Sequence, residues 1–117
     1  MSYQHESLAS GRWRRLSLIE QLANIGSEVE RALNWRDKGN PGYSERALER
    51  ALELIGLTIE DPRHKSRLKE ITRLREAILD YFLGENLYQT SEEFWRKYFY
   101  AFGYASRSRI KPNRCRS

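Results

Sequence analysis

The sequence is poor in the residues that build cross-links and chemical sites. It has one cysteine, Cys115, and two histidines, His5 and His64, among 117 residues. A lone cysteine forms no disulfide within the chain, which favours a reducing compartment. Two histidines without patterned cysteines or acidic partners are too few for a zinc site or a cysteine nucleophile. We therefore expect a cytoplasmic protein with no metal, no cofactor and no catalytic residues.

Long apolar runs are also missing. No stretch approaches the roughly 20 apolar residues of a membrane-spanning helix, and the first ten residues lack the apolar segment of a secretion signal. Proline and glycine, with three and seven residues, are sparse. The chain is nevertheless 39% hydrophobic, which is apolar enough for a folded domain with a real core.

Apolar residues recur three and four positions apart, the spacing of amphipathic helices. We expect four helices, over about 17–35, 41–60, 62–83 and 91–106. Short connections favour antiparallel neighbours. The predicted fold is therefore all-α, an antiparallel up-down-up-down four-helix bundle with basic, poorly ordered termini.

Local signals support these helices. Capping-box spacing is found in two pairs, Ser17 with Glu20 and Thr90 with Glu93. Asn40 and Asp61 each precede a proline, which suits the first helical position. Gly26 lies beside the apolar stripe of the first helix, where a glycine costs about 1 kcal/mol relative to alanine. We expect Gly26 to permit the close approach of another helix.

The positive charge belongs to the ends of the chain. Residues 1–15 and 107–117 carry eight Lys or Arg and one acidic residue, whereas residues 16–106 carry thirteen basic and fifteen acidic ones. We therefore divide the chain into a basic N-terminal arm (1–15), a four-helix bundle (16–106) and a basic C-terminal tail (107–117). Basic arms of this kind commonly bind nucleic acid or an acidic partner.

A third basic run, residues 63–69, opens the expected third helix, where the helix dipole is already positive. This run predicts an anion site, unless the nearby acids Glu60, Asp61 and Glu70 compensate its charge. The predicted nucleic-acid contacts come from all three clusters: Arg12, Trp13, Arg14, Arg15, Arg63, Lys65, Arg67, Arg107, Arg109, Lys111, Arg114 and Arg116. Such binding, to RNA or DNA, would be sequence-tolerant and strongly salt-dependent.

Half of the fourteen aromatic residues lie in the stretch 91–105. On a helix, one group of five faces one sector and is expected in the core: Phe94, Trp95, Tyr98, Phe99 and Phe102. Tyr100 and Tyr104 lie on the opposite side, where they and Trp13 could stack on unpaired bases. Surplus aromatic surface also marks protein interfaces. The predicted interface residues are Trp35, Tyr88, Tyr100 and Tyr104, and they favour a homo-oligomer.

The predicted function is a non-catalytic adaptor that self-associates and binds nucleic acid, or a nucleic-acid enzyme, through its basic arms. One alternative is a protein-only interaction module. The other is a small enzyme acting on a nucleotide, for which Glu45, Glu49 and Glu53 form an acidic strip. All-helical pyrophosphatases pair two acidic motifs, and the second is missing here.

Three segments carry a resemblance to known proteins. They are LIEQLANIGSEVERAL at 18–33, ERALELIGLTIEDPRHKSRLKEI at 49–71 and GENLYQTSEEFWRKYFYAFGYAS at 84–106. Together they resemble a small bacterial and archaeal family without an assigned activity, over about 18–106.

More distantly, the layout is similar to four-helix-bundle proteins of ribosomal-RNA intervening sequences and of diversity-generating retroelements. The retroelement accessories form basic oligomeric barrels that engage a reverse transcriptase and its nucleic acid. That likeness is one of architecture and charge, and it carries no functional residue to this chain.

Overall fold

The computed structural model describes residues 11–110, apart from the side chains of residues 109 and 110. Four helices account for most of this range: α2 (Leu18–Asp37), α3 (Pro41–Ile59), α4 (Leu68–Leu83) and α5 (Glu92–Ile110). A short 3-10 helix, η1 (Pro62–Arg67), leads from α3 into α4. The predicted all-α class is confirmed, since no residue from 11 to 110 lies in a strand. Within the same range, no helix has the length and apolar character needed to cross a membrane.

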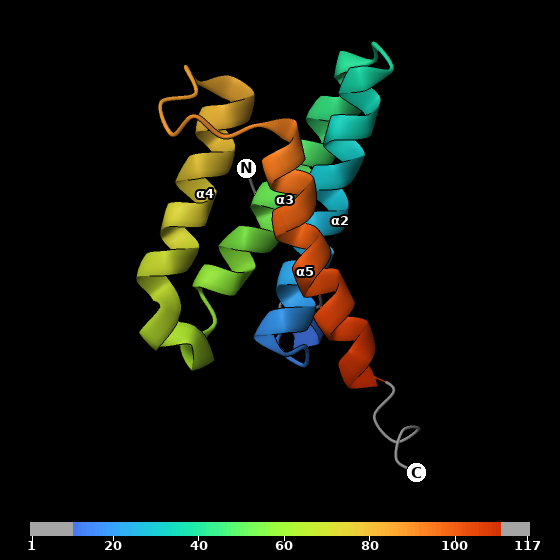
Figure 1. The fold of residues 1–117 in the computed structure, drawn as a ribbon. Helices are drawn as coiled ribbons and strands as arrows, with labels where there is room; N and C mark the ends of the chain where they lie inside the picture. Colours follow the sequence, from blue (N-terminus) through green and yellow to red (C-terminus); the bar gives the residue numbers. More distant parts are fainter. Residues whose placement is uncertain (1–10, 111–117) are drawn as a thin grey trace.

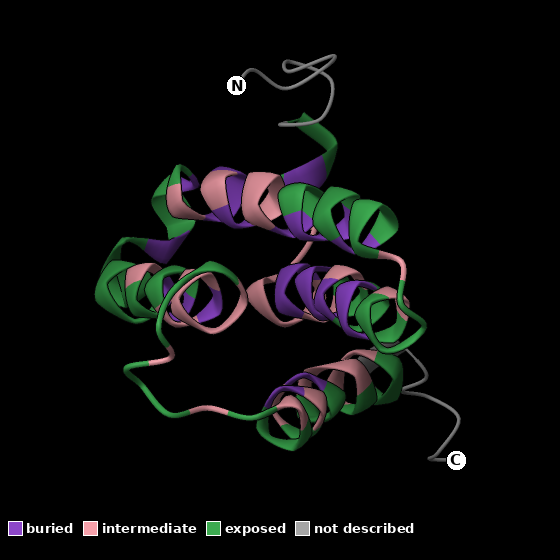
Figure 2. Ribbon diagram, turned by 90° about the horizontal axis from the view of Figure 1, so that it is seen from above, coloured by how far each residue is buried: buried purple, intermediate pink, exposed green. Residues whose placement is uncertain are grey.

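The helix α2 is the centre of the arrangement. It packs against α3 on one side and α5 on the other, and these are the two most extensive contacts between helices. Successive helices run in alternating directions (Figure 1). By contrast, α4 packs mainly on α3 and η1 and stands to the side of α5, as the view from above shows (Figure 2). This arrangement does not confirm a regular four-helix bundle.

The start of α2 is the predicted capping box. The Ser17 hydroxyl accepts a hydrogen bond from the Glu20 backbone N–H at 3.1 Å, and the Glu20 carboxylate accepts one from the Ser17 N–H at 2.9 Å. Similarly, the Asn40 side chain accepts from the Tyr43 N–H at 3.1 Å and begins α3. At each of these two helix starts, a capping side chain that the sequence identifies therefore satisfies an exposed backbone N–H group.

The capping box predicted at Thr90 is wrong. The hydroxyl of Ser91 accepts from the Phe94 N–H at 3.0 Å, so α5 begins one residue later than that box requires. The Thr90 hydroxyl instead accepts the indole N–H of Trp95 at 3.0 Å. A buried indole needs a hydrogen-bond acceptor, and this demand outweighs the local cap.

The single helix predicted over 62–83 is also wrong in its first turns. The Asp61 carboxylate accepts from the Arg63 backbone N–H at 3.0 Å and starts η1. His64 then leaves helical geometry, with φ −104° and ψ 23°, and its side chain is buried. Burial of this ring kinks the chain, and α4 therefore begins only at Leu68.

The role predicted for Gly26 is confirmed. A Cβ atom added at Gly26 would lie 2.6 Å from the Cβ atom of Phe99 on α5. Atoms this close overlap, so only glycine permits α2 and α5 to pack at this distance. The core then extends along α2 through Ile25, Val29 and Leu33, all essentially inaccessible to solvent.

The aromatic residues of α5 divide differently from the prediction. Trp95 and Phe99 are buried, and Tyr98 and Phe102 are half-buried against the core, as expected. Phe94 is 44% exposed, which contradicts its placement in the core. Leu68, at the start of α4, is also exposed, by 40%. Phe94 lines the open space between α4 and α5.

Candidate nucleic-acid interface

Part of the predicted basic arm belongs to the core. Trp13 is buried, and its indole N–H donates to the Thr58 hydroxyl at 2.8 Å, at the end of α3. The buried Gln21 amide donates to the Trp13 carbonyl at 2.9 Å and accepts from the His64 ring at 2.8 Å. Since an amide oxygen only accepts, His64 carries its proton on Nε2. Trp13 is therefore unavailable to stack on a base.

Arg63 is likewise committed to the fold. Its guanidinium donates to the Asp61 carboxylate at 2.7 Å and to the Leu16 carbonyl at 2.7 Å. Its hydrogen bond holds the pKa of the nearly inaccessible Asp61 carboxyl far below the usual range. Arg67 pairs with Glu70 at 3.4 Å. These pairs favour charge compensation over an anion site at the start of η1.

Six of the predicted basic contacts lie toward one end of the molecule. Arg12, Arg14 and Arg15 are exposed in the segment before α2, Lys65 and Arg67 in η1, and Arg107 near the end of α5. These three segments are distant in sequence but lie together at the lower end in Figure 1. We call this group the basic end.

A strip of two aromatic side chains flanked by two basic ones leads away from the basic end along α5. It consists of Lys97, Tyr100, Tyr104 and Arg107, at relative positions 0, 3, 7 and 10, which share one helix face. All four are exposed, Tyr100 by 65% and Tyr104 by 60%. We call these four residues the α5 strip.

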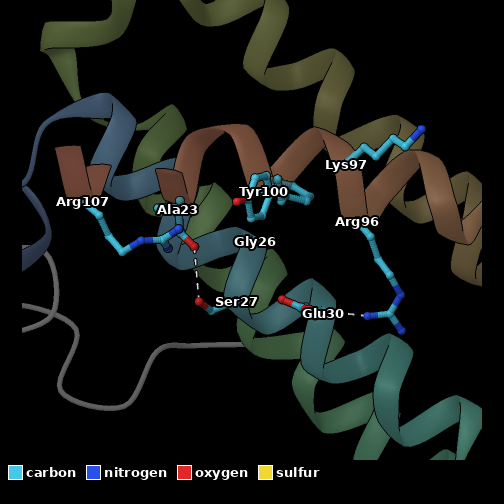
Figure 3. A pocket seen from close by; sticks show the side chains of 10 residues that line it. Ala23, Gly26, Ser27, Glu30, Arg96, Lys97, Tyr100 and Arg107 are labelled. Carbon is cyan, nitrogen blue, oxygen red and sulfur yellow. Dashed lines mark hydrogen bonds and ion pairs between the residues drawn. The ribbon is translucent and has the colours of Figure 1, made fainter. Parts of the chain in front are cut away.

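A polar hollow of about 420 Å³ lies where the α5 strip meets α2 (Figure 3). Its floor is made of small residues, Ala23, Gly26 and Ser27, and Tyr100 lies over them. Arg107 and Lys97 flank Tyr100 on opposite sides along α5. The close packing through Gly26 thus produces a shallow site in which an aromatic face lies between two cations.

Arg96 limits this site at the end away from the basic end. Its guanidinium donates to the Glu92 carboxylate at 2.8 Å and to the Asn34 side-chain carbonyl at 3.0 Å, and it pairs with Glu30 and Asp37 at 3.5 Å. Its hydrogen bond lowers the pKa of Glu92, whose own hydrogen bond raises the pKa of Asp37. Arg96 therefore joins α5 to α2 and is not free to bind an anion.

The predicted protein-interface residues do not form one surface. Trp35 is half-buried, with its ring 4.7 Å from that of Tyr43 at the turn between α2 and α3. Tyr88 is 50% exposed and lies near α4, its hydroxyl 3.3 Å from the Glu76 carboxylate. Tyr100 and Tyr104 belong to the α5 strip. The side chain of Arg109, and Lys111, Arg114 and Arg116, lie outside the described residues.

Lys97 is the one member of the strip absent from the residues predicted to bind. Its position is readable from the sequence, because it precedes Tyr100 by three residues. Lys97 belongs to none of the three basic clusters, so charge clustering alone does not single it out. Within residues 11–110, no three His, Cys, Asp or Glu side chains come together to hold a metal ion.

No protein-family model matches the chain. Comparison with curated proteins finds no match to its sequence, and comparison with solved structures finds none to its fold. The resemblance to a bacterial and archaeal family therefore stays a prediction.

Proposed function

We propose that this protein is a non-catalytic nucleic-acid-binding accessory protein that receives a single strand along the α5 strip. The supporting observation is that two exposed tyrosines, Tyr100 and Tyr104, lie between Lys97 and Arg107 on one helix face. Single-strand sites combine cations that contact phosphates with aromatic rings on which bases stack. For this role we take the four helices as an open antiparallel arrangement, in which α2 packs against α5 and holds it in place. The lone Cys115 supports a cytoplasmic setting for this role.

The basic end supplies the long-range attraction. Arg12, Arg14, Arg15 and Lys65 are exposed there and make no ion pair with any described residue. Arg107 belongs to both the basic end and the strip, so a strand bound along α5 continues onto the basic end. Phosphate contacts of this kind release counterions and give salt-dependent affinity without base specificity.

The decisive experiment measures binding of the full-length protein to labelled poly-pyrimidine strands of about 12 nucleotides over a salt series. We expect Tyr100→Ala with Tyr104→Ala to weaken binding by about tenfold or more, because each stacked base contributes about 1–3 kcal/mol. The matched control is Tyr100→Phe with Tyr104→Phe, which keeps both rings and should bind as the wild type does.

A charge series tests the other half of the strip. Lys97→Gln with Arg107→Gln should lower the slope of log K against log salt by about 1.4, since each phosphate contact on a single strand contributes about 0.7. Arg75→Gln removes an exposed arginine of α4 as a control and should leave the slope unchanged. Binding that tolerates both the Tyr→Ala and the Lys/Arg→Gln changes would place the nucleic acid elsewhere and contradict the proposal.

The protein-only interaction module is the second candidate. The apolar surface between α4 and α5, which the nucleic-acid proposal leaves unused, favours it.

A further inference from the structure

An apolar groove separates α4 from α5 on the side of α5 that faces away from the polar hollow. Its wider part has a volume of about 460 Å³. The apolar residues lining that part are Leu74, Ala77, Phe94, Trp95 and Tyr98. A narrower part of about 250 Å³ shares Leu74 and Tyr98 with it and reaches α2 at Leu18 and Leu22. We call the two parts together the α4–α5 groove.

The loop at the end of this groove presents apolar side chains to solvent. Residues 11–108 contain eight exposed large apolar side chains, and four of them fall within positions 83–94: Leu83, Leu87, Tyr88 and Phe94. Leu87 is the most exposed of the eight, at 77%. Such a concentration within twelve residues marks an interaction surface, whereas isolated exposed apolar residues are ordinary.

The loop holds Leu87 in a fixed position. The Asp80 carboxylate accepts hydrogen bonds from the backbone N–H groups of Leu87 at 2.8 Å and Tyr88 at 3.0 Å. The Asn86 side chain both accepts from the Thr90 N–H at 3.0 Å and donates to its carbonyl at 2.9 Å. An exposed leucine on an ordered loop loses little conformational entropy when it is buried by a partner.

We propose that the occupant of the α4–α5 groove is a second copy of this chain, in a two-fold symmetric dimer. In this dimer Leu87 of each copy enters the groove of the other. A two-fold interface uses the same surface on both subunits and must therefore be self-complementary. Here one end of the molecule carries both the protruding side chain and the hollow that would receive it.

The charge of the groove lining favours a second copy of the chain over a strongly charged partner. Glu70 and Arg73 both line the groove, so the surface that a two-fold dimer would bury carries both signs of charge. Residues 73–96 hold five acidic and three basic residues, which does not suit a polyanion. The groove-end loop and the basic end lie at opposite ends of the molecule (Figure 1). Two copies with a net charge of +5 each therefore meet without bringing their basic ends together.

This proposal does not depend on the nucleic-acid proposal. The test is sedimentation equilibrium of the full-length protein under reducing conditions at concentrations up to about 100 µM, enough to populate a dimer of micromolar affinity. We expect a dimer whose dissociation constant rises at least about tenfold in Leu87→Glu, since a buried leucine contributes more than the 1.4 kcal/mol that a tenfold change requires. Thermal unfolding of isolated Leu87→Glu monomers should match that of wild-type monomers, because the side chain is exposed within one copy.

The matched control is Leu68→Glu, which changes an exposed leucine at the start of α4, away from the groove-end loop. It should leave the dissociation constant unchanged. Dilution of 15N-labelled protein gives an independent readout, because dimer dissociation should shift the indole N–H signal of Trp95 in the groove and leave that of Trp13 in place.

A wild-type protein that stays monomeric at about 100 µM would overturn the proposal. A dimer unaffected by Leu87→Glu would overturn it as well, since the interface would then lie on another face. A monomer that binds an amphipathic helical peptide, with a shift of Trp95 fluorescence, would assign the groove to a foreign helix instead of a second copy.

Discussion

The helix α5 packs closely on one side and loosely on the other. Toward α2, Gly26 leaves room for the Phe99 side chain of α5 to lie directly against the backbone of α2. Toward α4, a groove of about 460 Å³ remains. On this side the rings of Phe94 and Tyr98 stack on each other, with centroids 5.8 Å apart, and both line the groove. The comparison teaches that one glycine decides which face of an aromatic helix becomes core.

The largest effect is expected where the packing is closest. Gly26→Ala places a Cβ atom 2.6 Å from the Phe99 Cβ atom. Because Cβ positions are fixed by the backbone, no rotamer change relieves this overlap and the helices must separate. Overpacking of this kind costs about 1–3 kcal/mol, and chemical denaturation should show a loss of unfolding free energy in that range.

The control for this change is a glycine on the facing helix. A Cβ atom at Gly103 would meet only the Arg107 Nη1 atom, at 3.4 Å, at the end of a flexible side chain. Gly103→Ala should therefore stabilise the protein by up to about 1 kcal/mol through helix propensity. If Gly26→Ala were equally harmless, the glycine would not be what sets the distance between α2 and α5.

The next effect is a dependence of stability on pH. It arises from the buried contact between His64 and Gln21, near the start of α2. Burial lowers the pKa of His64 below its ordinary 6.5, although the neighbouring Asp61 carboxylate opposes this shift. The unfolded chain therefore takes up a proton at a higher pH than the folded protein does. The contribution of neutral His64 to stability is present above about pH 6.5 and is lost as the pH falls below that value.

Asp61 adds a second loss at lower pH. The hydrogen bond from Arg63 lowers the pKa of this carboxyl from its ordinary 3.8, so its contribution is present above that value and disappears on further acidification. Urea titrations at pH 7.5, 5.5 and 3.5 (about one value in each window) should give successively lower unfolding free energies. His64→Gln should remove the first step only, and persistence of that step in His64→Gln would contradict the assignment.

The smallest effect on stability is expected in the α4–α5 groove. Ala77 lines its wider part and is half-buried, so the added atoms of Ala77→Leu enter space that is already open. Unfolding free energy of the monomer should change by no more than about 0.5 kcal/mol, as for an ordinary surface substitution. The same change should weaken the proposed dimer, and a large loss of monomer stability would show that the groove is closed in solution.

The sequence predicts the helices well because their signals are local. The capping box at Ser17 and the Asn40 cap each depend on residues within one turn, and both are confirmed. The role of Gly26 is also confirmed: its signal is the apolar stripe of its own helix, although the contact that it permits is with Phe99, 73 positions away. The kink at His64 depends on Gln21 and Trp13, which are 43 and 51 positions away. No local pattern indicates that these side chains meet, so the 3-10 helix was not predicted.

The candidate site likewise combines features that a local pattern predicts with features that depend on contacts between distant segments. The exposure of Tyr100 and Tyr104 follows from helical periodicity and is confirmed. The commitment of Arg63 to Asp61 and Leu16, and of Trp13 to Thr58, depends on how distant segments pack. Composition alone assigns these residues to a ligand because it cannot distinguish a basic or aromatic side chain that binds from one that closes the core.

The three tryptophans lie in three different parts of the fold. Trp13 is buried where the chain enters α2, Trp35 is half-buried at the turn into α3, and Trp95 is buried beside the groove. Each therefore serves as an intrinsic fluorophore for one region, and three variants with a single remaining tryptophan would follow the unfolding of each region separately. If the two sides of α5 differ in solution as they do in structure, the emission of Trp95 should respond to denaturant before that of Trp13.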